Sequence, residues 1–182
     1  MARILLAVLS AGFVAWTFRQ VRKPSGIFGK RVLNAMNVSH AALTDWGLRQ
    51  ITAPANATIL DVGCGSGRTL QKLAALAREG RAFGVDYSPT SAAVSKRTNS
   101  REPRQVHVVQ GSVAALPFPE GQFDLITAVE AHYYWPDLPA NMRGVLRALK
   151  PGGTLVLIAE TYRGGPLRFV YGAIMPLLRA AF

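Results

Sequence analysis

The stretch ILDVGCGSG, residues 59–67, decides the fold class of this 182-residue chain. A short run of mostly apolar residues, 58–62, is followed by three glycines at alternate positions. Such a run is typical of a strand buried on both faces, and glycines directly after a strand permit a tight turn into a helix. The stretch therefore predicts a strand, a turn and a helix, with Asp61 near the carboxyl end of the strand.

Similar apolar runs recur along the chain. We predict strands at residues 58–62, 82–86, 106–110, 123–129 and 154–159. Helical stretches separate them, and the clearest runs from Leu138 to Leu149 before the sequence KPGG at 150–153, which is expected to end the helix and turn the chain. This alternation predicts an α/β fold, a doubly wound and mostly parallel sheet with helices on both faces.

The residues that follow each predicted strand are the candidates for chemistry, because ligands of such sheets bind at the carboxyl ends of the strands. The first loop departs from two nucleotide motifs at Arg68, where a dinucleotide fingerprint needs a small residue and a phosphate-binding loop needs lysine. Asp86 stands 19 residues after Gly67, where a carboxylate can accept hydrogen bonds from both ribose hydroxyls. The pattern predicts a ligand with a ribose and without a pyrophosphate.

Four motifs in order extend this pattern: ILDVGCGSG, GVDYSP, LPFPEGQFDLITAVEAHYYWPD and VLRALKPGGTLVLIAE, within residues 57–160. In order and spacing they resemble the class I S-adenosyl-L-methionine-dependent methyltransferases, more narrowly the small bacterial group labelled type 11. The resemblance implies a Rossmann-like methyltransferase fold, S-adenosyl-L-methionine as cofactor, and a small-molecule methyl acceptor. No metal is expected, because the histidines and the cysteine form no ligand cluster.

The resemblance also implies a set of cofactor-binding residues. Gly63 and Gly65 would let the backbone approach the methionine part, and Asp61 would orient its amino group. Asp86 would hold the ribose and Tyr87 would lie on the adenine face. The full set is Asp61, Gly63, Cys64, Gly65, Gly67, Asp86, Tyr87, Ser112, Val113 and Glu130.

The remaining members of the set have plainer alternatives. Ser112 and the backbone of Val113 would meet the adenine edge, although many relatives carry aspartate where this chain has Ser112. Cys64 can be simply a small buried residue. Glu130 can face the cofactor or support its own loop.

His132 is the candidate general base, because it follows the fourth strand and its ordinary pKa suits proton transfer near neutrality. The alternative is that it only stabilises the loop. The aromatic residues at 133–135 can form a wall for a flat acceptor or can anchor the loop to the core. Asp124 is expected to be structural.

Both ends of the chain depart from the family pattern. Family members continue past the fifth strand with a helix and two strands, whereas residues 161–182 are all that follow here, so we expect the last two strands to be missing. An uncovered fifth strand would favour self-association. The predicted organisation is an apolar segment at 1–22, a helical cap at 23–52 and the cofactor-binding domain at 53–182.

The N-terminal part carries its own predictions. Residues 4–18 are uncharged and apolar, about 22 Å as a helix against a hydrocarbon core of about 30 Å, and basic residues follow. They predict either an anchor that holds a cytoplasmic domain to the inner face of the plasma membrane, or a buried helix. In the cap, Leu33, Met36, His40, Leu43 and Trp46 recur at helical spacing, which predicts a helix that covers one end of the fold.

Charge and composition restrict the function classes. The net charge is +11, yet all ten acids lie between Asp45 and Glu160, and this middle part holds 12 basic residues against 10 acids. The balance argues against a cationic nucleic-acid groove. One cysteine and three scattered histidines exclude an internal disulfide and a clustered metal motif. The leading hypothesis is a small-molecule methyltransferase; the alternatives are a non-catalytic cofactor-binding or interaction protein and, more weakly, an RNA methyltransferase.

Overall fold

A parallel sheet forms the centre of the molecule. The computed structural model describes residues 16, 17 and 19–160. Its five strands are β1 (Thr58–Val62), β2 (Arg81–Asp86), β3 (Val106–Gln110), β4 (Phe123–Val129) and β5 (Leu149–Ile158). Their order is β3-β2-β1-β4-β5, with all neighbours parallel. Chain order thus reverses between β1 and β4, the arrangement that opens a crevice at the carboxyl ends of these two strands.

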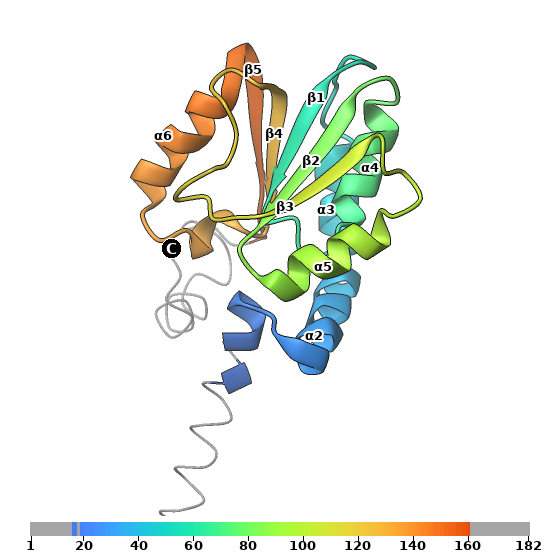
Figure 1. The fold of residues 1–182 in the computed structure, drawn as a ribbon, viewed down its shortest axis with the longest axis vertical. Helices are drawn as coiled ribbons and strands as arrows, with labels where there is room; N and C mark the ends of the chain where they lie inside the picture. The colour runs from blue at the N-terminus through green and yellow to red at the C-terminus, as the bar shows by residue number, and fades with distance from the viewer. Residues whose placement is uncertain (1–15, 18, 161–182) are drawn as a thin grey trace, which may run out of the picture.

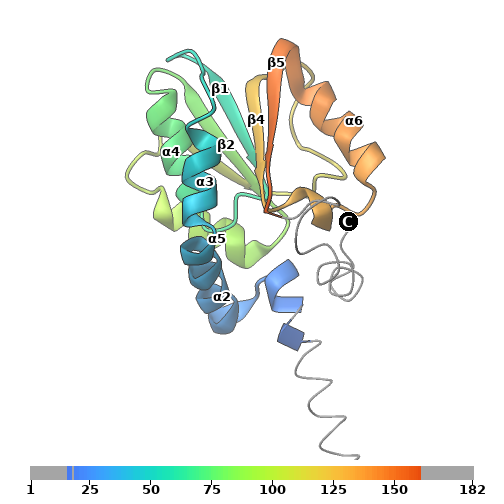
Figure 2. The same ribbon diagram turned by 180° about the vertical axis from the view of Figure 1, so that it is seen from behind.

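Helices cover both faces of the sheet, which confirms the doubly wound α/β prediction (Figures 1 and 2). The helices are α2 (Gly26–Ser39), α3 (Ala41–Leu48), α4 (Arg68–Leu76), α5 (Pro89–Thr98) and α6 (Leu138–Ala148), with a short 3₁₀ helix at His132–Tyr134. Successive residues of β1 point to opposite faces: Ile59 packs in a core cluster with Leu73 of α4, and Leu60 in a cluster with Val145 of α6. The central strand is therefore buried on both sides.

The helical cap differs from the single helix that the apolar spacing predicted. The helix breaks at His40, whose backbone has left helical geometry at φ −96° and ψ 3°, and α2 and α3 are separate helices. Helix α3 packs against β5 so closely that a Cβ on Gly47 would lie 2.5 Å from the side chain of Ile158. This contact buries Gly47 and leaves the preceding Trp46 exposed.

The fifth strand begins earlier than predicted. Helix α6 ends at Ala148, and β5 starts at Leu149 and runs through the KPGG sequence, where its pairing with β4 shifts register. Proline and glycine are tolerated here because β5 pairs only with β4 in the described part of the chain, and irregular edge strands accept both residues. The predicted turn at 150–153 is therefore an irregularity within the strand.

Asp124 has the structural role expected for it. At the amino end of β4, its carboxylate accepts a hydrogen bond from the backbone N–H of Thr58 at 2.8 Å and from Lys150 Nζ at 2.8 Å. These bonds tie three strands together at the end of the sheet away from the crevice. Burial acts to raise the pKa of Asp124, but the bonds to Lys150 and Thr58 hold it below its ordinary value.

Two of the predictions fall mainly or wholly outside the described residues, and a third falls within them. The expected loss of the last two strands concerns residues 161–182, and the apolar anchor concerns residues 4–18, of which the structure describes Trp16 and Thr17. The exposed fifth strand is described as far as Ile158, and Leu157 on it is solvent-exposed. Among the described helices, none has the length and apolar character that crossing a bilayer requires.

Candidate functional site

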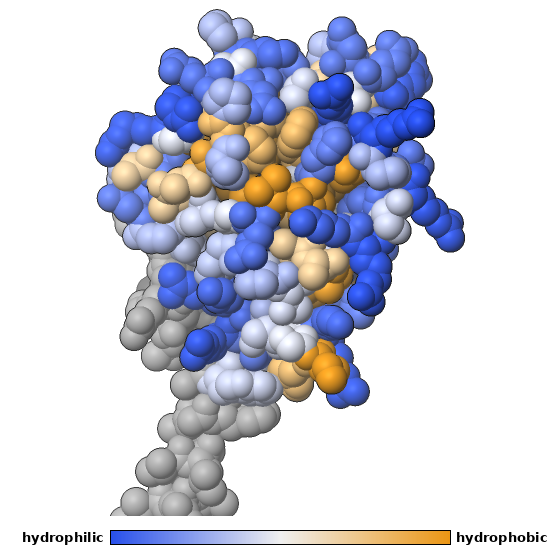
Figure 3. All heavy atoms as spheres, in the orientation of Figure 1, coloured by the Kyte–Doolittle hydropathy of each residue, from blue (hydrophilic) through white to orange (hydrophobic). Residues whose placement is uncertain are grey.

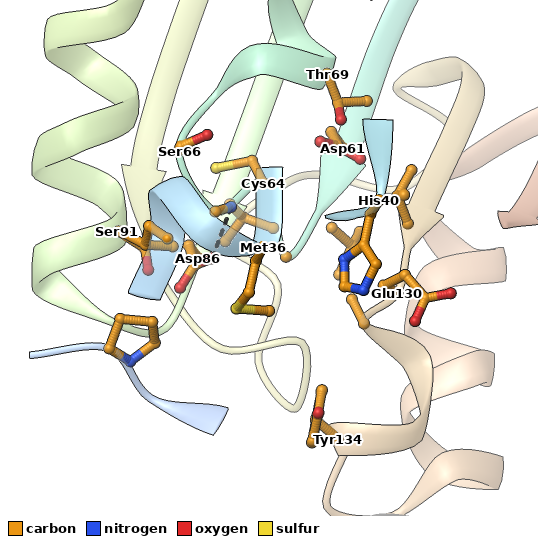
Figure 4. Close-up of a pocket in the computed structure, with 18 of the residues that line it drawn as sticks. Met36, His40, Asp61, Cys64, Ser66, Thr69, Asp86, Ser91, Glu130 and Tyr134 are labelled. Carbon is orange, nitrogen blue, oxygen red and sulfur yellow. Dashed lines mark hydrogen bonds between the residues drawn. The ribbon is translucent and has the colours of Figure 1, made fainter. Parts of the chain in front are cut away.

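A cavity of about 260 Å³ opens at the carboxyl ends of the strands, between the sheet and α2 (Figure 4). The loops that follow the first four strands all contribute to its lining, together with α2 and α3. Nine of the ten predicted cofactor residues lie in that lining: Asp61, Gly63, Cys64, Gly65, Asp86, Tyr87, Ser112, Val113 and Glu130. Gly67 and His132 do not.

The glycine turn after β1 depends on conformations that other residues avoid. Gly63 has φ +83° and Gly65 has φ +51°. The N–H groups of Gly63 and Cys64 both donate to the carbonyl of Val85 at the end of β2, at 2.8 and 3.1 Å. A Cβ on Gly63 would lie 2.6 Å from the Cβ of Ala131 in the loop after β4. The turn is therefore held between the end of β2 and the loop after β4, with no space for a side chain at its first glycine.

Gly67 and Cys64 contribute to packing behind the turn. The side-chain amide of Asn99 donates to the carbonyl of Gly67 at 3.1 Å, and a side chain on Gly67 would run into Ser95 and Asn99. Cys64 is buried, with its Sγ 3.7 Å from the hydroxyl of Ser95, and burial raises the pKa of the thiol well above its ordinary value. These contacts set the distance between α4 and α5.

Asp86 ends β2 with its carboxylate at the cavity. Its Oδ2 accepts from the backbone N–H of Gly65 at 2.9 Å, the bond dashed in Figure 4, and its Oδ1 accepts from the N–H of Ser88 at 2.9 Å. Burial raises the pKa of Asp86, and these two bonds act in the opposite direction. A carboxylate has about four acceptor positions, so Asp86 keeps the capacity to accept from a pair of hydroxyl groups.

Asp61 is almost completely buried beside the turn. The hydroxyl of Thr127 on β4 donates to its Oδ1 at 2.8 Å. Burial raises the pKa of Asp61 to about 7, and the nearby charge of Asp86 acts in the same direction. Two acids thus face one cavity, and Asp61 changes its charge near neutrality. The motifs located both acids, but only the packing of β1 against β4 reveals this titration.

Tyr87 and Ser112, which the family resemblance assigns to the adenine, both line the cavity. The hydroxyl of Tyr87 donates to the carbonyl of Arg22 at 2.8 Å, and Lys23 Nζ lies 5.0 Å from the centre of its ring. The N-terminal segment therefore holds the Tyr87 ring in place. Ser112 Oγ accepts from the N–H of Ala114 at 3.2 Å, which stabilises the turn after β3.

Glu130 occupies a strained position at the end of β4, with φ +51° in a residue other than glycine. Its carboxylate accepts from the hydroxyl of Tyr133 and from the backbone N–H of Glu160, beyond the end of β5. Both oxygens therefore bond to the chain itself, which favours loop support between the two roles considered for Glu130. Tyr134 also lines the cavity, and burial raises its pKa to about 12.

The expectation that His132 faces the site does not match its place in the structure. Residues His132–Tyr134 form a 3₁₀ turn, which directs Tyr134 and Trp135, and not His132, to the cavity lining. His132 Nδ1 is buried and has no hydrogen-bond partner in the described part of the chain. Burial also lowers the pKa of His132. The bond from Tyr133 to Glu130 fixes the orientation of the turn.

The cap supplies cavity residues that the motifs did not indicate. The hydroxyl of Ser66 donates to Asn37 Oδ1 at 2.7 Å, and the hydroxyl of Ser88 donates to the carbonyl of Pro24 at 2.6 Å. Of the five cap residues that recur at helical spacing, Leu33, Met36 and His40 line the cavity, whereas Leu43 and Trp46 do not. The cap also contributes Asn37, Ala41 and Thr44 to the lining.

The sheet order and the glycine turn after β1 place the protein in the Rossmann-like α/β class. Within the described residues, no group of three or more histidine, cysteine or acidic side chains is placed to hold a metal ion. The family model described as a methyltransferase domain matches residues 59–153. The chain belongs to this methyltransferase family.

Similar curated proteins support this assignment. The methyltransferase YdaC of Bacillus subtilis, whose function is uncharacterised, is 28% identical over 125 residues, covering 69% of this chain and 68% of YdaC. The demethylmenaquinone methyltransferase of Lactococcus lactis is 29% identical, covering 69% of this chain and 52% of its own length. The 2-methyl-6-phytyl-1,4-hydroquinone methyltransferase of Synechocystis is 36% identical, and the match covers 64% of this chain and 36% of that protein. The matched part of this chain thus corresponds to between about one third and two thirds of the length of these relatives.

Solved structures share the fold. A methyltransferase in complex with the Trm112 methyltransferase activator of Haloferax volcanii superposes with a TM-score of 0.65 at 28% identity, covering 69% of this chain and 54% of the other. The YcgJ protein of Bacillus subtilis gives a TM-score of 0.60 at 27% identity, covering 65% and 50%.

Proposed function

We propose that this protein is an S-adenosyl-L-methionine-dependent methyltransferase that acts on a small molecule with an apolar ring. The observation that carries the proposal is the cavity itself. It brings the glycine turn and two buried acids, Asp61 and Asp86, together with aromatic and apolar side chains from the loop after β4 and from the cap.

The residues present fit the cofactor. Asp86 has free acceptor positions for the two ribose hydroxyls, and Tyr87 offers an aromatic face beside it. The loop with Ser112 and Val113 would receive the adenine edge. When bound, S-adenosyl-L-methionine supplies an electrophilic methyl group on a sulfonium, which is a good leaving group.

Asp61 would bind the ammonium group of the cofactor. The side chain is nearly inaccessible to water, so its attraction for a cation is only weakly screened. With its pKa raised to about 7, Asp61 carries the required negative charge above neutrality and loses it in acid. The proposed role therefore predicts a pH-dependent affinity for the cofactor.

The remaining cavity wall suits an apolar acceptor. Leu33 and Met36 enter from α2, while Tyr134 and Pro136 enter from the loop after β4. Two similar proteins are named for demethylmenaquinone and for a phytyl hydroquinone, and these names support a hydroquinone-like acceptor for this chain. The cap would hold the acceptor near the methyl group and exclude water, the main requirements of an in-line transfer.

Calorimetric titration with S-adenosylhomocysteine tests the cofactor site. Replacement of Asp86 by alanine removes charge-assisted hydrogen bonds worth roughly 1.5–3 kcal/mol, so the dissociation constant should rise about 10-fold to 150-fold. Asp124→Asn is the control, because Asp124 lies at the amino end of β4, which is the end of the sheet away from the cavity. Its affinity should match that of the wild type.

Radiolabelled methyl transfer to a panel of hydroquinones then tests the activity. Product with at least one acceptor is expected from the wild type, and less from Asp86→Ala. Tight binding of the cofactor product without turnover on any ring acceptor would favour the non-catalytic alternative.

A further inference from the structure

The outer face of α2 combines exposed apolar and basic side chains. Ile27 and Val38 are 76% and 74% exposed, the largest exposures among the large hydrophobic residues described. They are 11 positions apart, about three helical turns, so they lie on the same side of the helix about 16 Å apart. Lys30 and Arg31 are exposed between them on that side. The helix therefore presents a mixed apolar and cationic stripe to solvent.

Exposed apolar groups are concentrated in this part of the molecule. Of the eight large hydrophobic residues that are exposed in the described chain, five precede β1: Trp16, Ile27, Phe28, Val38 and Trp46. The ring of Phe28 lies 4.5 Å from that of Trp16, at the start of the stripe. In Figure 3, hydrophobic and strongly hydrophilic atoms lie side by side over α2, toward the lower right of the described atoms.

The charge of this region has one sign. Between Trp16 and Thr44 the sequence holds five basic residues and no acid, and Asp45 is the first acid of the chain. The basic residues are Arg19, Arg22, Lys23, Lys30 and Arg31. An anionic partner would meet attraction here without a repelling carboxylate on the same helix.

The opposite face of α2 is already occupied by the cavity. Leu33 and Met36 line it. Asn37 lies on the flank between the two faces, where it lines the cavity and accepts from the hydroxyl of Ser66 at 2.7 Å. Figures 1 and 2 show α2 beyond the carboxyl ends of the strands, at the periphery of the fold. Packing within the described fold therefore cannot cover the outer stripe while the cavity contacts persist.

We propose that the outer face of α2 docks on an anionic lipid bilayer and brings the cavity to its surface. Branched apolar side chains flanked by cations are the composition of interfacial helices, which bury the apolar groups at the acyl boundary and place the cations at headgroups. Ile27 and Val38 would gain nothing from a nucleic-acid backbone, so lipid is favoured over RNA. Resting on the proposed function, this docking would deliver a lipid-soluble acceptor.

An environment-sensitive fluorophore on Val38→Cys of the full-length protein tests the contact directly. The native thiol of Cys64 is buried and should react little with the fluorophore. Wild-type protein treated in the same way measures this background labelling. Vesicles of phosphatidylcholine with 30% phosphatidylglycerol should shift the emission to the blue, and phosphatidylcholine alone should not. The same label on Leu146→Cys, exposed on α6, should keep its aqueous emission.

A matched pair of charge variants tests the cations. The double variant Lys30→Gln with Arg31→Gln should raise the lipid concentration that gives half of the maximal emission shift by about 30-fold. This is the effect expected from the loss of two charges at an anionic surface. Lys96→Gln with Arg97→Gln, an adjacent exposed pair on α5, should change it less than twofold.

The outcomes separate this docking from the proposed function. Aqueous emission at position 38 while the protein floats with vesicles would overturn the docking, as would an emission shift with transfer RNA and none with vesicles. Equal effects of the two charge pairs would also overturn it. Titration of each variant with S-adenosylhomocysteine without lipid reports the cofactor site separately: normal affinity with failed docking leaves the proposed function intact.

Discussion

The two sides of the cavity are built in different ways. The loops after β1 and β2 form the proposed cofactor side, and their polar groups bond to one another: Gly65 to Asp86, and Gly63 to the carbonyl of Val85. The proposed acceptor side consists of α2 and the loop after β4, whose contribution is largely side chains such as Met36 and Tyr134. The cofactor side is thus held by hydrogen bonds of the backbone, whereas the acceptor side is a surface of packed side chains.

This difference shows which parts of the site tolerate change. A backbone network fails when a single residue cannot adopt the required dihedral angles. A surface of side chains accepts substitutions of similar volume and changes its preference gradually. We therefore expect the largest losses from the glycine turn, intermediate effects from the charge of the buried acids and the smallest from the cap.

Gly63→Val should produce the largest effect. Valine at φ +83° is strained, and its Cβ would lie 2.6 Å from that of Ala131, so affinity for S-adenosylhomocysteine should fall more than 100-fold. Gly121→Val is the control, because Gly121 also has positive φ, at +62°, but has open space around it. Its affinity should stay within twofold. A folded Gly63→Val protein with normal affinity in calorimetry would contradict the assignment of the turn.

The pH dependence of binding sharpens the comparison on the cofactor side. Asp61 ionises as the pH rises through about 7, and only the ionised form attracts the ammonium of the cofactor product. From pH 5.5 to pH 7 the ionised fraction grows from about 3% to about half, so affinity should rise by up to about 15-fold. Burial also raises the pKa of Asp86, so ionisation of Asp86 can add to the rise of affinity with pH.

Asp61→Asn separates these two contributions. The variant should bind more weakly at pH 7 and should lose most of the rise, because asparagine does not titrate. Circular dichroism at each pH checks that the fold persists. An unchanged pH profile in Asp61→Asn would remove Asp61 from the ammonium role.

Asn37→Ala should give the smallest effect and tests the link between the two sides. It removes the acceptor of the Ser66 hydroxyl, a bond worth about 0.5–1.5 kcal/mol, so affinity for S-adenosylhomocysteine should fall about twofold to tenfold. Asn34→Ala changes the same residue type on the exposed side of α2. Equal losses in the two variants would show that the cap acts through helix stability and not through this bond.

The strands next to the site were predictable because they are short apolar runs, of which the central ones, β1 and β4, are buried on both faces. The predicted limits of β1, β3 and β4 agree with the structure, and β2 differs by one residue. The family motifs located the loops after β1, β2 and β4, since three of the motifs contain these strand ends. The loop after β3 lies outside the quoted motifs and was located from the predicted strand at 106–110. Nine of the ten residues taken from the resemblance lie at the cavity.

The failures have local causes. The KPGG sequence usually ends regular structure, but an edge strand has only one partner and absorbs the irregularity, so β5 begins at Leu149. His132 follows β4 as predicted, yet one 3₁₀ turn is enough to rotate it away from the cavity lining. Sequence position specifies the loop on which a side chain lies, but not the direction of that side chain.

The sequence by itself determined the order of strands and helices, the glycine turn and the two acids, because these depend on local dihedral preferences and on periodic burial. Only the tertiary structure decided the rest. The pKa of Asp61 near 7 arises from burial between β1 and β4, and the outward position of Ile27 and Val38 arises because the other face of α2 covers the cavity. Both properties depend on which elements meet in space, and residues far apart in the chain supply those contacts.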